Sequence, residues 1–463
     1  MSLRSISSLL ILSAVAVTPW IGGANTTLWV KGWWLAAPLA LAFFLLCVQR
    51  AREGKFPVLP WPAGEAVFFL LGCLAWWMTK PEPAFPTAFS EEHWHFLETT
   101  FPFMIFQWPR FARLAFLAGV LLGFLAVLDL GASPEFRRRL RLTIGLSGLA
   151  LALYALGMRW LGWPILPWIN QAADTERFNV GFFHHSGPGA CLNLAWPLLV
   201  FGSLHTEAPR FPVVRNVAIV LVAAAALTLW HSLAAPLIAA ALLLTGVFLH
   251  ARVAAAKKTS PLLIRSLIAA AFLAIGMWQW QSLQPLRVQP DGWISAAQTE
   301  RDAPARDAAI RTAALKRGDR LVASTTPPRP AAWLAAARMA SDYPLIGLGP
   351  GSWVKRVVLY SNDTIVNTFY QHRQFAHHDL LQTAAEWGGL GALAWLSIWL
   401  GALWRATGRR VRSTLEDPGL VLALVGLAVH STVHSPLQNP ALLLWTVVLL
   451  GLAWSTPRTA GSD

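Results

Sequence analysis

The longest polar stretch of this hydrophobic chain ends, at residues 376–391, in AHHDLLQTAAEWGGLG. The histidine pair His377-His378 stands where this stretch, residues 284–378, meets a glycine-hinged hydrophobic run. Apolar runs of helical length lie on both sides of the stretch. Titratable side chains at a membrane boundary are costly, which makes them candidates for function. The pattern therefore predicts a helical membrane protein with its chemistry at one membrane face.

The composition supports a membrane location. The 463 residues are 55% hydrophobic and 13% charged, whereas soluble globular chains carry about 25% charged residues. A formal charge of +14 can indicate a nucleic-acid partner. Most of the basic residues, however, fall in short loops between apolar runs, so we expect the lipid bilayer as a partner and no nucleic acid. All three cysteines lie in apolar segments, which predicts neither a disulfide nor a metal site.

The apolar runs predict an all-α polytopic membrane protein with about 12 transmembrane helices and one large, partly helical periplasmic loop. We expect transmembrane helices one to nine in residues 1–283, the loop in 284–378, and helices ten to twelve in 379–463. The first run is interpreted as a transmembrane helix rather than a cleaved signal. The runs lie near 6–24, 33–48, 66–79, 111–130, 142–160, 186–204, 214–231, 233–250, 266–283, 386–404, 418–433 and 440–456.

The distribution of basic residues predicts the orientation. With a cytoplasmic N-terminus, nineteen Lys and Arg residues lie inside and six lie in short outside loops, Arg113 among them. The positive-inside rule then places both termini in the cytoplasm and the long loop outside, which in a bacterium is the periplasm. Within that loop we expect an amphipathic helix at 303–317, a second helix at 330–342, and a tight irregular turn at 344–351.

Three motifs together resemble the O-antigen ligase and O-antigen polymerase superfamily of bacterial membrane glycosyltransferases. The first runs from Arg329-Pro330-Ala331-Ala332-Trp333 to Gly347-Leu348-Gly349-Pro350-Gly351-Ser352-Trp353. The second is His377-His378, then nine intervening residues, then Gly388-Gly389-Leu390-Gly391, and the third is Arg177-Phe178-Asn179-Val180-Gly181. The resemblance covers roughly residues 170–455. Two positions depart from the family pattern: His378 replaces a small polar residue, and His231-Ser232 lacks the arginine that many members carry.

The resemblance implies a metal-independent, inverting-type glycosyltransferase without cofactors, located in the bacterial inner membrane as a multi-pass protein. Its donor would be a glycan on undecaprenyl pyrophosphate. Its acceptor would be a hydroxyl of lipid A–core, which makes O-antigen ligation the leading expectation. The same signature fits an O-antigen or exopolysaccharide polymerase and a protein O-oligosaccharyltransferase, and a small-anion transporter of the bicarbonate type is a weaker alternative.

The resemblance also nominates the site residues. The family register favours His377 as the catalytic base, although His378 is an alternative. Substrate contacts are expected from Arg329, Arg177, Arg338, His378, Glu386, Gly349, Gly351, His184 and His185. The chemistry fits these residue types, because arginine forks match phosphate oxygens and histidine can take the proton of a hydroxyl.

Several of these residues also have plain structural interpretations. His377 could be a polar cap at a helix start, and Arg329 could face water. Gly388 and Gly391 are expected to allow close helix packing. His430 and His434 lie one helical turn apart; they could bind a metal, but a wet interfacial pair is the simpler interpretation.

Overall fold

The computed structural model describes residues 2–20, 33–56, 59–79, 110–161, 163, 186–201, 212–229, 234–257, 328–357, 360, 375–408, 410–411, 414–415 and 417–455. These residues form helices, with one two-residue antiparallel ladder between β1 and β2. The elements are α1 (Leu3–Val17), α3 (Trp33–Arg52), α4 (Ala63–Thr79), α6 (Arg110–Leu130), α7 (Pro134–Leu161), α8 (Ser186–Val200), α9 (Pro212–Leu229), α10 (Ala234–Lys257), α14 (Pro328–Asp342), α15 (Ser352–Arg356), α18 (Asp379–Gly408), β1 (Arg410–Val411), β2 (Thr414–Leu415), α19 (Pro418–Ser431), η3 (Pro436–Gln438) and α20 (Pro440–Trp454).

The expected all-α membrane fold is confirmed in its class. Among the described residues, four helices are long and apolar enough to cross a membrane, at Leu35–Arg52, Arg113–Leu130, Pro134–Leu161 and Asp379–Gly408. Seven shorter apolar helices accompany them within the described residues. The expected run at 266–283 lies outside those residues, so the total of about 12 spans stays a prediction.

Two local predictions about helices are confirmed. The neighbouring runs at 214–231 and 233–250 form two separate helices, α9 and α10. The helix expected at 330–342 is α14, which begins slightly earlier, at Pro328, and ends at Asp342. The amphipathic helix expected at 303–317 falls outside the described residues.

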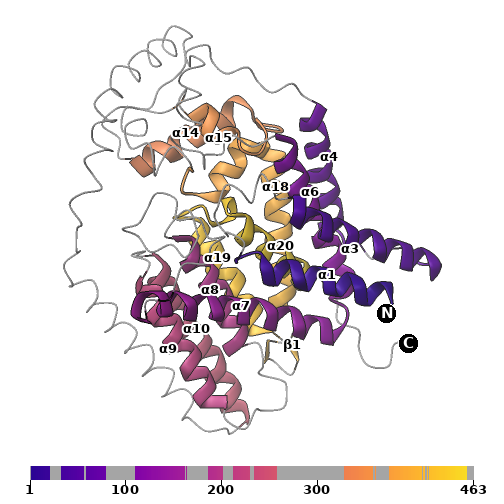
Figure 1. Ribbon diagram of the computed structural model, residues 1–463. Coiled ribbons are helices and arrows are strands. Elements are labelled where there is room, and N and C mark those ends of the chain that lie inside the picture. The colour runs from indigo at the N-terminus through magenta and orange to yellow at the C-terminus, as the bar shows by residue number, and fades with distance from the viewer. Residues whose placement is uncertain are drawn as a thin grey trace.

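The helices pack into one bundle around a continuous apolar core (Figure 1). α6 lies between α3 and α20, while α8 packs against α7 and α19. α14 and α15 lie beside the first part of α18. Capping side chains begin the last two α-helices: Asp417 caps α19 by accepting from Leu420 N–H, and Asn439 caps α20 by accepting from Ala441 and Leu442 N–H.

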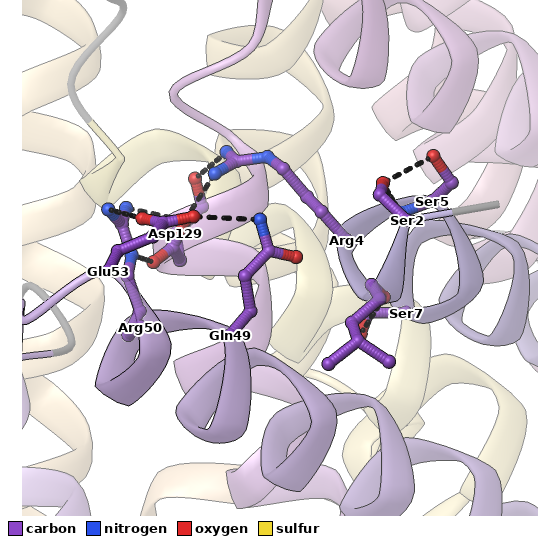
Figure 2. Close-up of polar contacts among 9 residues, drawn as sticks. Ser2, Arg4, Ser5, Ser7, Gln49, Arg50, Glu53 and Asp129 are labelled. Carbon is purple, nitrogen blue, oxygen red and sulfur yellow. Dashed lines mark hydrogen bonds and ion pairs between the residues drawn. The ribbon is translucent and has the colours of Figure 1, made fainter.

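An ion triad of Arg4, Arg50 and Asp129 joins α1, α3 and α6 (Figure 2). The carboxylate of Asp129, at the end of α6, lies 3.0 Å from Arg4 Nη1 and accepts a bond from Arg50 Nη2 at 2.9 Å. The side chains of Asp129 and Arg50 are only 5% and 7% exposed. The start of α1, the end of α3 and the end of α6 therefore meet at the same end of the bundle.

The start of α7 is fastened to the C-terminal part of the chain at that same end. Arg137 Nη1 donates to Leu452 O at 2.9 Å and to Ser455 Oγ at 2.7 Å. Arg141 pairs with Asp417 at the start of α19. Basic residues that the charge pattern assigns to one membrane side are thus gathered at one end of the bundle. The C-terminal part of α18 lies at this end, because Arg405 donates to Trp454 O at the end of α20. His377, which precedes the N-terminus of α18, therefore lies at the opposite end.

Candidate functional site

α18 is broken by a turn from a distant part of the chain. Gly388 lies inside the helix with φ 70° and ψ −179°, a conformation that is not helical. Beyond the break, Gly389 N–H donates to Pro344 O at 2.6 Å and Leu390 N–H donates to Leu345 O at 3.1 Å. In an unbroken helix these amides would donate to carbonyls four residues earlier in α18. The turn therefore supplies the acceptors that the break removes.

The same turn also satisfies the carbonyls before the break. Gly349 N–H donates to Glu386 O at 2.7 Å, and Leu348 N–H lies 3.4 Å from Ala385 O. Backbone groups left unpaired in a buried or membrane environment are costly. The 344–349 turn and the break in α18 thus complete each other's hydrogen bonding.

Two glycines make this exchange possible. Gly347 has φ 73°, and a Cβ on it would lie 2.4 Å from Gly388 N. A Cβ on Gly388 would lie 2.4 Å from the backbone carbon and oxygen of Leu345. The expectation that Gly388 allows close helix packing is therefore wrong: its neighbour is the 344–349 turn, and its positive φ is the reason for glycine.

Glu386 stands at the centre of this junction. Its side chain is 2% exposed, and its Oε1 accepts from Trp353 N–H at 3.3 Å and from Gln382 Nε2 at 3.4 Å. Arg113 Nη2 lies 3.9 Å from Glu386 Oε2. The carboxylate thus connects α18, the start of α15 and α6.

Arg113 is a buried cation that the motif-based interpretation missed. It lies near the start of α6, 8% exposed in its side chain, and its Nη2 is 3.4 Å from Gln438 Oε1. A Cβ on Gly351 would lie 1.9 Å from Arg113 Nη1, so the guanidinium occupies the space that a side chain at residue 351 would need. The available signal was an arginine placed inside an apolar run, which is costly without a partner.

The two histidines before α18 point to different neighbours. His377 is 3% exposed and adopts φ 53°, and its ring centroid lies 5.9 Å from that of His434. His378 is half-buried, with its ring 5.8 Å from Trp333 of α14. Its Nδ1 lies 3.4 Å from Leu381 N–H, at the first turn of α18, and burial lowers the pKa of His378 below its ordinary value. Of the two imidazoles, His377 is the buried one.

Side chains of α18 hold the histidine segment in place. Gln382 Oε1 accepts from Ala376 N–H at 3.0 Å. Asp379 Oδ2 accepts from Leu437 N–H at 3.1 Å, which ties the η3 turn to the start of α18. The η3 turn also carries Gln438, the neighbour of Arg113. His377 therefore lies in a corner built from α18, α19 and η3.

The arginines nominated in the loop lie on α14. Its buried face, which includes Ala332, Ala335 and Met339, belongs to a small apolar cluster, and the helix packs against α18. Arg329 is exposed at the start of the helix, and Arg338 is half-buried further along it. Both residues thus share the helix that contacts His378. Arg177, His184 and His185 lie outside the described residues.

A comparison with protein families matches residues 217–396 to the O-antigen ligase family model. The matched segment includes α14, the 344–349 turn, the histidine pair and the break in α18. A comparison with curated proteins finds no match. The family match confirms the resemblance to the O-antigen ligase superfamily, and together with the apolar helices it indicates a multi-pass membrane protein with a glycan-transferring role.

Proposed function

From the O-antigen ligase domain carried by residues 217–396, we propose that this membrane protein transfers a glycan from undecaprenyl pyrophosphate to an acceptor hydroxyl. The favoured acceptor is lipid A–core, which makes the reaction O-antigen ligation. The observation that carries the proposal is the buried corner around His377, which lies within the segment that matches the O-antigen ligase family model.

The proposed reaction is a single displacement. His377 takes the proton of the acceptor hydroxyl while the acceptor oxygen forms a bond to the anomeric carbon of the donor. The bond from that carbon to the phosphate oxygen breaks, and undecaprenyl pyrophosphate leaves with the electron pair. One displacement inverts the anomeric configuration. A positioned base contributes about 10²- to 10⁴-fold to such a step.

Arginines hold the leaving group in this proposal. Arg329 and Arg338 of α14, with Arg177, bind the pyrophosphate oxygens, since guanidinium forks match phosphate geometry. Charge held in advance at the leaving group removes the need for a metal ion. His378, His184 and His185 are proposed to contact the sugar or the acceptor.

The other nominated residues support the site from within the protein. The hydrogen bond from Gly349 N–H to Glu386 O and the packing of Gly351 on Arg113 give both glycines a structural role. The Glu386 carboxylate has a structural role as well, because it accepts hydrogen bonds from the backbone amide of Trp353 and the side chain of Gln382. Substrate contact through these three residues stays a prediction.

We place the protein in the bacterial inner membrane with both termini in the cytoplasm. The gathering of Arg4, Arg50, Arg137 and Arg141 at the end of the bundle opposite His377 supports this orientation by the positive-inside rule. The 284–378 loop is then a periplasmic domain, and the site meets donor and acceptor at the outer face.

The lipopolysaccharide gel pattern of a deletion strain tests the proposal. A ligase deletion leaves bare lipid A–core and accumulates long lipid-linked chains, and the wild-type gene restores the ladder whereas a His377→Ala gene does not. Core capped with a single repeat would instead assign the protein as a polymerase. An unchanged pattern would exclude both and favour protein glycosylation or anion transport.

A further inference from the structure

Three imidazoles lie close together at the corner where α19 meets α18, with His434 near both of the others. The ring centroid of His434 lies 5.9 Å from that of His377 and 5.4 Å from that of His430. All three residues are buried, with exposures of 3%, 4% and 1% for His377, His434 and His430. Ring nitrogens at this spacing are within reach of one another through one bridging water.

Hydrogen bonds from α19 and α18 hold the segments that carry these three imidazoles in place. The backbone N–H of His434 donates to the backbone carbonyl of His430 at 2.9 Å, so the segment that carries His434 continues the last turn of α19. Asp379 ties the following η3 turn to α18 through Leu437 N–H, as described above. The αL backbone of His377, at φ 53°, is strained for a residue with a side chain and persists only where the surroundings fix it. The fold therefore fixes how the rings of His377 and His434 face each other.

His430 adds a second observation. Within the described residues, neither of its ring nitrogens has a hydrogen-bond partner, although the side chain is almost fully buried. Buried polar groups without a partner are rare in native proteins, and each needs an explanation such as a bound water or a catalytic role. A buried imidazole beside a second imidazole is suited to act as a neutral hydrogen-bond acceptor.

We propose that His434 is a positioning residue for the base His377, with His430 as its support. His434 accepts the N–H of one His377 ring nitrogen, directly or through one water, and His430 accepts the N–H of His434 through a water. The other ring nitrogen of His377 then keeps its lone pair for the acceptor hydroxyl, as the orienting partner of a catalytic histidine ensures elsewhere. This inference rests on the proposed transfer reaction.

The test compares purified variants in lipid with an undecaprenyl-pyrophosphate-linked glycan as donor and lipid A–core as acceptor. His434→Phe should lower kcat about 10- to 100-fold, the loss typical when the partner of a functional histidine is removed. KM for the donor and the melting temperature should stay at the wild-type values. His434→Gln should recover most of the rate, because an amide can still accept the hydrogen bond.

His430→Phe should lower kcat less than His434→Phe, since it acts one residue further away. Thr432→Ala is the matched control: it lies in the same corner, its side chain is exposed, and its hydroxyl donates to Val429 O of α19. Wild-type kcat in His434→Phe would overturn the inference, and so would a rate loss in proportion to a fall in melting temperature. Those outcomes leave the proposed function standing, whereas a wild-type protein without transfer overturns both.

Discussion

Replacing Gly388 with alanine tests the junction between the 344–349 turn and α18. The new Cβ would lie 2.4 Å from the backbone of Leu345, and the residue would have to keep φ 70°. Backbone strain of this kind costs about 1–3 kcal/mol. Overpacking against a neighbour that cannot rotate away costs about 1–3 kcal/mol more. The expected loss of about 2–6 kcal/mol is a large part of a typical stability of about 5–15 kcal/mol.

The measurement is thermal unfolding of the purified protein in detergent, followed by a transfer assay below the melting temperature. Gly388→Ala should melt earlier and lose transfer, because the turn that carries Gly349 and Gly351 is displaced together with Glu386. Gly347→Ala should behave alike, since it meets the same contact from the other side. Gly72→Ala is the control: it lies in α4 with nothing within 4 Å of the new Cβ. If Gly388→Ala and Gly72→Ala melt and react alike, the proposed exchange of hydrogen bonds is not what holds this site.

Five further outcomes are expected. His377→Ala should abolish transfer while folding and donor binding persist; an active variant would remove His377 as the base. His378→Asn should keep most of the activity because it restores the commoner family residue, and a loss as severe as that of His377→Ala would move the base to residue 378. Burial lowers the pKa of His378, so folding favours its neutral form. The contribution of His378 to stability is therefore fully present above the unfolded-state pKa of about 6.5 and is lost as the pH falls through the lower folded-state pKa. His378→Asn lacks this titration, so its melting temperature should fall less steeply below about pH 6.5. Asp129→Asn should destabilise the protein by about 3–5 kcal/mol, because it removes the buried carboxylate that bonds Arg50 and leaves it paired with the exposed Glu53, and an unchanged denaturation midpoint would contradict that estimate. A cysteine placed at residue 295 should react with an impermeant reagent from the periplasmic side; reaction only after the inner membrane is opened would reverse the orientation.

The sequence predicts those parts of the fold that depend on neighbouring residues. Apolar runs of helical length correctly indicate helices such as α6, α9 and α10, because hydropathy and length act locally. The tight turn at residues 344–351 and the start of α14 near Pro330 can also be predicted, because they too depend on neighbouring residues. His377 and Glu386 were also predicted as site residues from the sequence. Both are buried, His377 just before α18 and Glu386 within the first part of that helix.

The rest of the site depends on contacts between distant segments. The break at Gly388 exists because residues 344–349 supply the hydrogen-bond acceptors that α18 lacks there. No pattern among neighbouring residues predicts that pairing. Arg113 was counted with the residues of short outside loops because its partner, Glu386, lies more than 250 residues away in the sequence. The neighbourhood of His377, His430 and His434 likewise arises only when α18 and α19 have packed.

The bond between Arg137 and the end of α20 bears on how the polypeptide is made. Arg137 is synthesised early, yet its acceptors at Leu452 and Ser455 leave the ribosome 315 and 318 residues later. Until then the guanidinium lacks these two acceptors, and the start of α7 cannot be tied to the end of α20. A chain that stops before Leu452 never forms this tie. The order of synthesis therefore makes the joining of α7 to α20 a late step in building this end of the bundle.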